Sequence, residues 1–301
     1  MVCMLVQLRR NRRLLARTIR QTALVLTFFC AIAHVARAQV DFTVVIRDLP
    51  ADQKILEPVI KANLIAAAKA WADHVDAKPC TIGILFRVDR AANAGRGSGR
   101  SVVTARLGNE KQDGKLVSEQ GWASKMRTGK AASGDQLDIE IVLEPTYMKT
   151  IWWDPDPAAR KERIPGGKLD SMSVLLHEFG HALAFNGWRD PKTGQLPANF
   201  ISTYDRNVTF ENDNFFYVGP AATKLWGGPI PLAKTRTNYH HFCEELSGRN
   251  VQLKADLMNG VVMEYAHRYE IGLLDLAVLA DCGIPLKAIS KGKGDSGKSG
   301  K

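Results

Sequence analysis

The chain has 301 residues, of which 45% are hydrophobic and 24% charged, and its formal net charge is +10. This is the composition of an ordinary globular protein. The positive excess lies at the two ends, because residues 1–38 hold seven arginines and no acids, and residues 290–301 hold four lysines against one aspartate. The part between is close to neutral and has no basic stripe with interleaved aromatics. We therefore expect no nucleic-acid partner.

Residues 1–38 predict a secretory signal peptide. Arginines precede the apolar run Thr22–Val35, and Ala36-Arg37-Ala38 follows as an A-x-A cleavage pattern. The alternative is a membrane anchor, but a run of about 14 residues is shorter than the ~20 that a spanning helix needs. We expect a mature chain that begins near Gln39, a secreted or periplasmic location, and no stable membrane anchor after cleavage.

The first part of the mature chain predicts alternating strands and helices. Residues 40–50 alternate as a strand and stop at Pro50. Residues 51–75 place their apolar side chains on one helical face, and Pro58 predicts either a kink or the true start of that helix. Three further strand candidates follow, at residues 80–89, 101–108 and 136–145.

The second part predicts two helices separated by a long irregular stretch. Asp170 is a good N-cap for a helix over Ser171–Phe185, and Asn186-Gly187 predicts its end. Residues 188–256 are expected to be mostly irregular, and a last helix is expected over Gly272–Asp281. The expected fold class is therefore α+β in one two-lobed domain over residues 39–288, with a mixed β-sheet plus helices in front and a loop-rich back lobe. Residues 289–301 predict a disordered basic tail.

Three cysteines remain after the expected cleavage: Cys80, Cys243 and Cys282. Export favours disulfides, and an odd count leaves at least one thiol outside an intrachain pair. The sequence does not determine which two would pair.

The helix over residues 171–185 contains the pattern H-E-x-x-H. His177 and His181 are about 40° apart in helical projection, so both imidazoles face one side, one turn apart. Neutral imidazoles at this spacing suit Zn²⁺, with Zn–N distances of about 2.0–2.1 Å. Glu178 lies about 100° round from His177, where it can flank the metal and act as general base towards a zinc-activated water. The rest of the helix is apolar, and buried imidazole and carboxyl groups need the partner that a metal supplies.

A catalytic zinc generally has three protein ligands and one open position. The pattern resembles the metzincin metallopeptidases, whose motif is H-E-x-x-H-x-x-G-x-x-H followed by a Met-turn. This chain departs from it, since Ala184 stands at the glycine position and Gly187 at the third histidine. The resemblance resumes later: Asp256–Gly260, "DLMNG", is similar to the Met-turn with Met258 as its methionine, and the helix Gly272–Asp281 resembles the final helix of the family.

A displaced third ligand resolves the departure. The leishmanolysin-like branch of the superfamily has a long insertion after the second histidine, and its third ligand is a histidine followed by an aromatic, shortly before the Met-turn. His241-Phe242 matches, seventeen residues before Met258. The resemblance therefore implies His241 as the third ligand, with its neighbour His240 as the alternative, because adjacent side chains of an extended segment point opposite ways. Further alternatives stay open: His267, and a gluzincin-type glutamate at Glu211, Glu244 or Glu245.

The resemblance implies a secreted zinc-dependent endopeptidase. His177, His181 and His241 would hold Zn²⁺, Glu178 would be the general base, and a protein or peptide substrate would lie along an edge strand, for which residues 102–107 and 137–143 are candidates. The alternative is an exported zinc-binding or adhesion protein without catalysis. Ala184, Gly187 and Gly260 favour it, because some metzincins have a tyrosine at the position of Gly260; Tyr265 or Tyr269 could replace that tyrosine.

Overall fold

The computed structural model describes residues 39–90, 96–132, 134, 137–234, 238–242, 248–260 and 263–288. The chain divides into two compact units between Gln39 and Val40, and all secondary structure described below belongs to the second unit. The expected signal peptide, the expected basic tail and Cys243 lie outside the described residues. Within the described ranges, no helix has the length and apolar character to cross a membrane.

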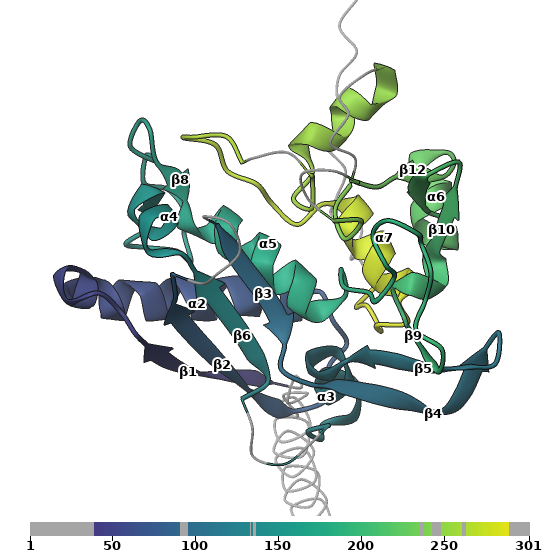
Figure 1. The fold of residues 1–301 in the computed structure, drawn as a ribbon. Coiled ribbons are helices and arrows are strands. Elements are labelled where there is room, and N and C mark those ends of the chain that lie inside the picture. The colour runs from purple at the N-terminus through teal and green to yellow at the C-terminus, as the bar shows by residue number, and fades with distance from the viewer. Residues whose placement is uncertain are drawn as a thin grey trace, which may run out of the picture. The chain divides into compact units, whose positions relative to one another are not determined.

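A four-stranded mixed sheet with the order β1-β2-β6-β3 forms one side of this unit (Figure 1). Strands β1 (Val40–Arg47), β2 (Cys80–Val88) and β6 (Ile139–Leu143) run parallel, and β3 (Gly97–Ser101) pairs antiparallel with β6. Strand β6 is buried at every residue because it lies between β2 and β3. The sheet edge next to β6 is therefore β3, which the sequence pattern did not predict as a strand of its own.

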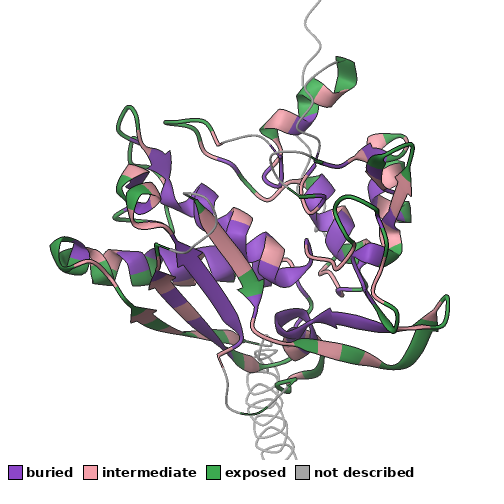
Figure 2. Ribbon diagram, viewed as in Figure 1, coloured by how far each residue is buried: buried purple, intermediate pink, exposed green. Residues whose placement is uncertain are grey.

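Two helices cover one face of this sheet. A 3₁₀ helix over Ala51–Leu56 leads into α2 (Glu57–Ala72), so Pro58 lies in the first turn and marks the start of the helix, one of its two predicted roles. Helix α5 (Ser171–Leu183) packs against α2 and β3, and most of its residues are buried (Figure 2). The Trp71 indole N–H of α2 donates to Leu176 O of α5 at 2.9 Å.

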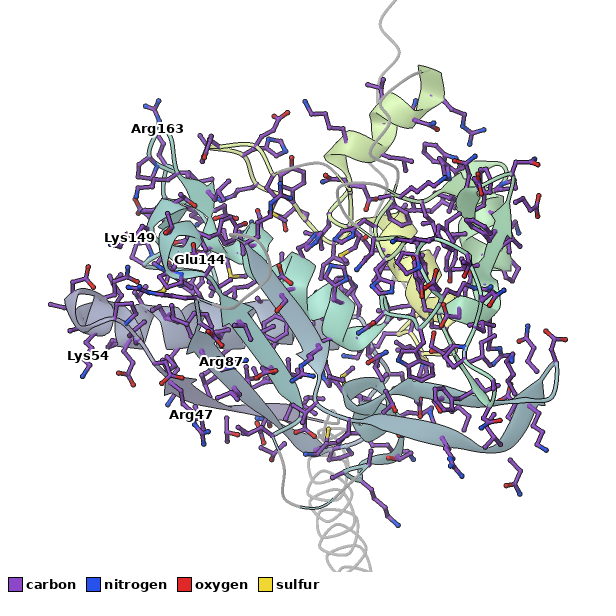
Figure 3. The ribbon with its side chains drawn as sticks, viewed as in Figure 1. Arg47, Lys54, Arg87, Glu144, Lys149 and Arg163 are labelled. Atoms are coloured by element: carbon purple, nitrogen blue, oxygen red, sulfur yellow. The ribbon has the colours of Figure 1, made fainter. Side chains whose placement is uncertain are left out.

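The opposite face of the sheet carries charge. Because side chains alternate along strands, Ile139, Ile141 and Leu143 face the helices while Glu140 faces away. The Glu140 carboxylate accepts from Nε of Arg87 on β2 at 2.8 Å and from Nε of Arg100 on β3 at 2.7 Å. Arg87 is labelled in Figure 3, together with side chains such as Arg47 and Lys54 that project away from the ribbon.

Short elements complete the unit. The remaining strands are β4 (Thr104–Gln112), β5 (Lys115–Gln120), β7 (Ile151–Trp152), β8 (Leu169–Asp170), β9 (Phe200–Ser202), β10 (Val208–Glu211), β11 (Asn214–Tyr217) and β12 (Ile230–Pro231). The remaining helices are α3 (Gly121–Thr128), α4 (Pro145–Thr150), α6 (Pro220–Trp226), α7 (Leu273–Asp281) and the 3₁₀ turns η3 (Asp205–Asn207) and η4 (Gly248–Ala255). The strands form three further sheets, β4-β5-β9, β10-β11-β12 and β7-β8.

Several boundaries differ from those expected. Residues 188–256, which were expected to be mostly irregular, contain in their described part only short elements, namely β9–β12, α6 and the 3₁₀ segments η3 and η4. The expected strand over residues 101–108 is two strands, since β3 ends at Ser101 and β4 begins at Thr104 in a different sheet. The predicted last helix is present as α7, with Gly272 as its N-cap. The predicted mixed α+β class is confirmed.

Candidate metal centre

Helix α5 begins as its capping residue predicts. The Asp170 carboxylate accepts from the Ser173 N–H at 2.9 Å and from the Ser173 hydroxyl at 2.7 Å, which satisfies a free amide of the first turn. The helix ends earlier than predicted, at Leu183, and the N–H groups of Ala184 and Phe185 both donate to Gly180 O. Gly187 therefore lies beyond the helix and is not its cap.

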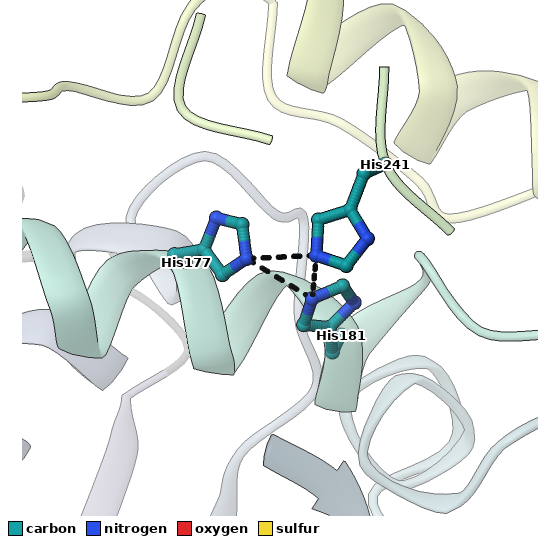
Figure 4. A group of neighbouring side chains, drawn as sticks. All are labelled: His177, His181 and His241. Carbon is teal, nitrogen blue, oxygen red and sulfur yellow. Dashed lines mark hydrogen bonds between the residues drawn. The ribbon is translucent and has the colours of Figure 1, made fainter. Parts of the chain in front are cut away.

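Three imidazoles meet beside the C-terminal half of α5. His177 and His181 come from the helix, and His241 comes from a segment 60 residues after His181 (Figure 4). Their Nε2 atoms are 3.1 Å apart for His177 and His241, 3.1 Å for His181 and His177, and 3.0 Å for His181 and His241. The structure thus brings together the three histidines that the sequence and the resemblance nominated.

The hydrogen bonds of the Nδ1 atoms determine whether each Nε2 atom carries a hydrogen or a lone pair. Nδ1 of His177 lies 2.8 Å from Leu257 O, Nδ1 of His181 lies 2.8 Å from Phe185 O, and Nδ1 of His241 lies 3.2 Å from Asn238 O. A carbonyl oxygen only accepts, so each Nδ1 carries the hydrogen and each neutral ring presents a lone pair at Nε2. Three lone pairs therefore point at one another, an arrangement that a Lewis acid stabilises. Backbone carbonyls on the outer nitrogens are common around metal-bound histidines.

Burial keeps the three rings neutral. It lowers the pKa of His177 to about 4, and burial together with the neighbouring imidazoles lowers the pKa values of His181 and His241 well below the ordinary value. Neutral imidazole is the form that binds metal ions.

The alternative ligands lie elsewhere or outside the described residues. Nε2 of His240 accepts from the Gly187 N–H at 2.9 Å, so this nitrogen is engaged away from the three-histidine cluster. Glu211 ends β10 and is exposed, and the His267 ring packs edge-on against Tyr269 with centroids 4.6 Å apart. Neither belongs to the cluster. Glu244 and Glu245 lie outside the described residues.

Glu178 lies where α5 meets the edge strand β3. Its side chain is buried, and burial raises the pKa of its carboxyl to about 8, although a hydrogen bond from the Gly99 backbone acts in the opposite direction. A Cβ on Gly99 would lie 2.0 Å from Glu178 O, so the approach of strand to helix requires glycine there. The sequence pattern did not predict this contact. The alternation of small residues at 97, 99 and 101 was the available signal.

Met258 packs against α5 at Gly180, which lies between the two helical histidines in the chain. The side chain is fully buried, and a Cβ on Gly180 would lie 2.6 Å from its sulfur. Its carbonyl accepts from the Phe242 N–H at 2.8 Å, so the same loop holds the residue after His241. Met258 thus contacts both chain segments that supply the imidazoles.

The structure changes which strand could bind a substrate, and it shows where the two candidate tyrosines lie. Residues 137–143 cannot serve as a free edge, because β6 is paired on both sides, and residues 104–107 belong to a different sheet. Tyr269 is buried and its hydroxyl accepts from the Glu264 N–H at 3.4 Å, whereas Tyr265 is 58% exposed. The thiols of Cys80 and Cys282 are free.

No protein-family model, curated protein or solved structure matches this chain. The chemistry open to the site follows from its groups: three neutral imidazoles that can hold one metal ion, and the buried carboxyl of Glu178, the residue after His177, which can exchange a proton.

Proposed function

We propose that this domain is an exported zinc-dependent endopeptidase with a metzincin-like, two-lobed arrangement. The observation that carries the proposal is the meeting of three Nε2 lone pairs, with the buried carboxyl of Glu178 following His177 on the same helix. A set of three histidines leaves one coordination position open, as catalytic zinc sites do and structural ones do not. Strand β3 and Met258 both pack against α5, in agreement with the metzincin resemblance.

His177, His181 and His241 would hold the zinc ion. When bound, zinc supplies a Lewis acid that acidifies water and polarises a carbonyl oxygen. In its ionised form Glu178 accepts the proton of the attacking water and delivers it to the leaving amine, and its raised pKa makes the carboxylate a stronger base than an exposed glutamate. Its position suits this role, because it follows His177 directly on α5 and the Gly99 backbone holds its carboxyl.

The substrate would be an extended peptide added along β3. This strand is the edge of the four-stranded sheet, and such an edge can pair with a further strand. Its residues Gly97 and Gly99 both lie within reach of Glu178. A peptide on this edge would therefore run past the carboxyl that handles the proton.

Glu178→Gln tests the reaction. We expect the variant to keep its zinc, measured by metal analysis, and to lose at least about 100-fold in casein cleavage, since general-base catalysis contributes 10²–10⁴-fold. Glu211→Gln on the exposed end of β10 is the control and should keep full activity. Undiminished cleavage by Glu178→Gln would refute the mechanism.

A second candidate is an exported protein that binds zinc without turnover. It is favoured by the surroundings of the tyrosines, because Gly260 offers no phenol, Tyr269 is engaged with Glu264, and Tyr265 faces solvent. Wild-type protein that contains zinc but does not cleave casein or gelatin would support this candidate. Cleavage that a chelator abolishes supports the peptidase.

A further inference from the structure

The segment that supplies His241 is tied to the turn that follows α5. Two hydrogen bonds cross between them: the Gly187 N–H donates to Nε2 of His240 at 2.9 Å, and the Arg189 N–H donates to Oη of Tyr239 at 2.7 Å. The two accepting side chains are those immediately before His241 in the chain. The third imidazole is therefore held against the element that supplies the other two.

A buried carboxylate lies at the centre of this contact. Asp205 is fully buried, and its Oδ1 accepts from the Tyr239 hydroxyl at 2.9 Å. Its Oδ2 accepts from the Trp188 N–H and from the Ser202 hydroxyl, each at 2.8 Å. A buried carboxylate with several donors fixes their positions, because breaking one bond leaves a polar group unpaired away from water.

Gly187 is the point of closest approach in this network. A Cβ there would lie 2.3 Å from Asp205 Oδ1 and 2.5 Å from Tyr239 Oη, so no side chain fits. The position at which the metzincin motif has its third histidine is thus filled by the contact between Asp205 and Tyr239.

The far side of the His241 segment is fixed by backbone contacts. His241 O accepts from the Ala233 N–H at 3.0 Å, and the Phe242 N–H donates to Met258 O at 2.8 Å. These contacts fix the His241 segment against the Met258 loop and the Ala233 backbone, while the Asp205 network links it to the turn that follows α5.

We propose that Asp205 and Tyr239 are positioning residues, which hold His241 at the separation from His177 and His181 that a single metal ion requires. This inference rests on the proposed metal centre and extends it to two residues that touch neither the ion nor the substrate. Groups that orient metal ligands from behind commonly change metal affinity by 10–100-fold.

Tyr239→Phe is the direct test. The ring and its stacking on Phe215, with centroids 4.7 Å apart, are kept, while the hydroxyl that joins Asp205 to Arg189 is removed. We expect zinc affinity, measured by competition with a chromogenic chelator, to fall about 10–100-fold. Tyr217→Phe is the matched control, because it removes another buried phenol hydroxyl, 3.5 Å from Val278 O, and should leave zinc affinity unchanged.

A double-mutant cycle shows whether the Tyr239 hydroxyl affects zinc affinity through His241 or through a general loss of stability of the fold. In a His241→Ala background, Tyr239→Phe should cause no further loss of zinc affinity, since the hydroxyl acts through the imidazole that has been removed. Gly187→Ala should behave like Tyr239→Phe, because its methyl group displaces the same two oxygens. Equal losses with and without His241, or wild-type affinity in Tyr239→Phe, would overturn the positioning role. Wild-type protein that binds no zinc would overturn the metal centre itself, whereas zinc binding without casein cleavage would contradict only the peptidase function.

Discussion

Gly180 lies between the two histidines of α5 and faces Met258 across a tight contact. A Cβ at this position would lie 2.6 Å from the Met258 sulfur and 3.3 Å from the ring of Trp71. Both neighbours are fully buried and cannot move into solvent. A single hydrogen atom in place of a methyl group therefore sets the distance between α5 and the loop that carries Met258.

Gly180→Ala should destabilise the fold although alanine favours helices. Overpacking a buried contact typically costs about 1–3 kcal/mol, and this outweighs the gain of up to ~1 kcal/mol in helix propensity. Urea unfolding of the metal-free protein measures the difference. Gly166→Ala is the control, because a Cβ there meets nothing within 4 Å. A Gly180→Ala variant as stable as wild type would show that Met258 can move aside freely.

At the scale of elements, two neighbouring aspartates lie where the Met258 loop meets α7: Asp275 is fully buried and Asp256 is half-buried. Asp256 Oδ1 accepts from the Met258 N–H at 3.0 Å, and Asp275 Oδ2 accepts from the Gly272 N–H at 2.7 Å at the start of α7. The carboxyls lie close enough to influence each other's ionisation. Burial raises the pKa of Asp256, and burial together with the Asp256 charge raises the pKa of Asp275 well above its ordinary value.

This pair predicts a loss of stability with rising pH. A carboxyl whose folded-state pKa is raised binds its proton more tightly in the folded chain, so its contribution is complete below the unfolded pKa near 3.9. The contribution is lost as the pH rises through the folded pKa. Asp275→Asn cannot ionise and should therefore be more stable than wild type at pH 8, with the difference shrinking towards pH 4. Urea midpoints of metal-free protein across this range test it, and parallel curves for the two proteins would contradict it.

The sequence predicted elements whose pattern is local. Asp170 identifies the start of α5, Pro58 the start of α2, and alternating apolar residues the buried strands β2 and β6. Strand β3 was not predicted because its glycines and serines show no hydrophobic periodicity. Its role at the site depends on the close approach of Gly99 to Glu178, which is a tertiary contact. The short strands of residues 200–231 were not predicted because they depend on pairing with other strands: β10, β11 and β12 pair with one another, and β9 pairs with β5.

The residues of the candidate site likewise fall into those that a local pattern predicts and those that depend on tertiary contacts. His177, Glu178 and His181 follow from one helical pattern, whereas the nomination of His241 needed a family resemblance, because no local rule connects positions 60 residues apart. Asp205 and the separate role of His240 could not be predicted, since each depends on tertiary contacts with Gly187 and its neighbours.

At the scale of the whole molecule, the sequence of residues 1–38 predicts a removable leader. Strand β1 begins at Val40, so cleavage after Ala38 would leave every described strand intact. We expect protein exported from an expressing cell to begin near Gln39, as read by N-terminal sequencing. Ala38→Arg, which spoils the small residue next to the cut, should block this processing. Exported wild-type protein that still begins at Met1 would contradict the prediction.

The three imidazoles also join distant parts of one chain. His181 and His241 are 60 positions apart, and the stretch between them contains β9–β12 and α6. An ion bound by both histidines closes this stretch into a ring, much as a disulfide would, and so reduces the entropy of the unfolded chain. The domain has free thiols at Cys80 and Cys282. A metal ion held by these histidines would thus cross-link two distant segments of the domain, and losing the ion would remove this constraint on the unfolded chain.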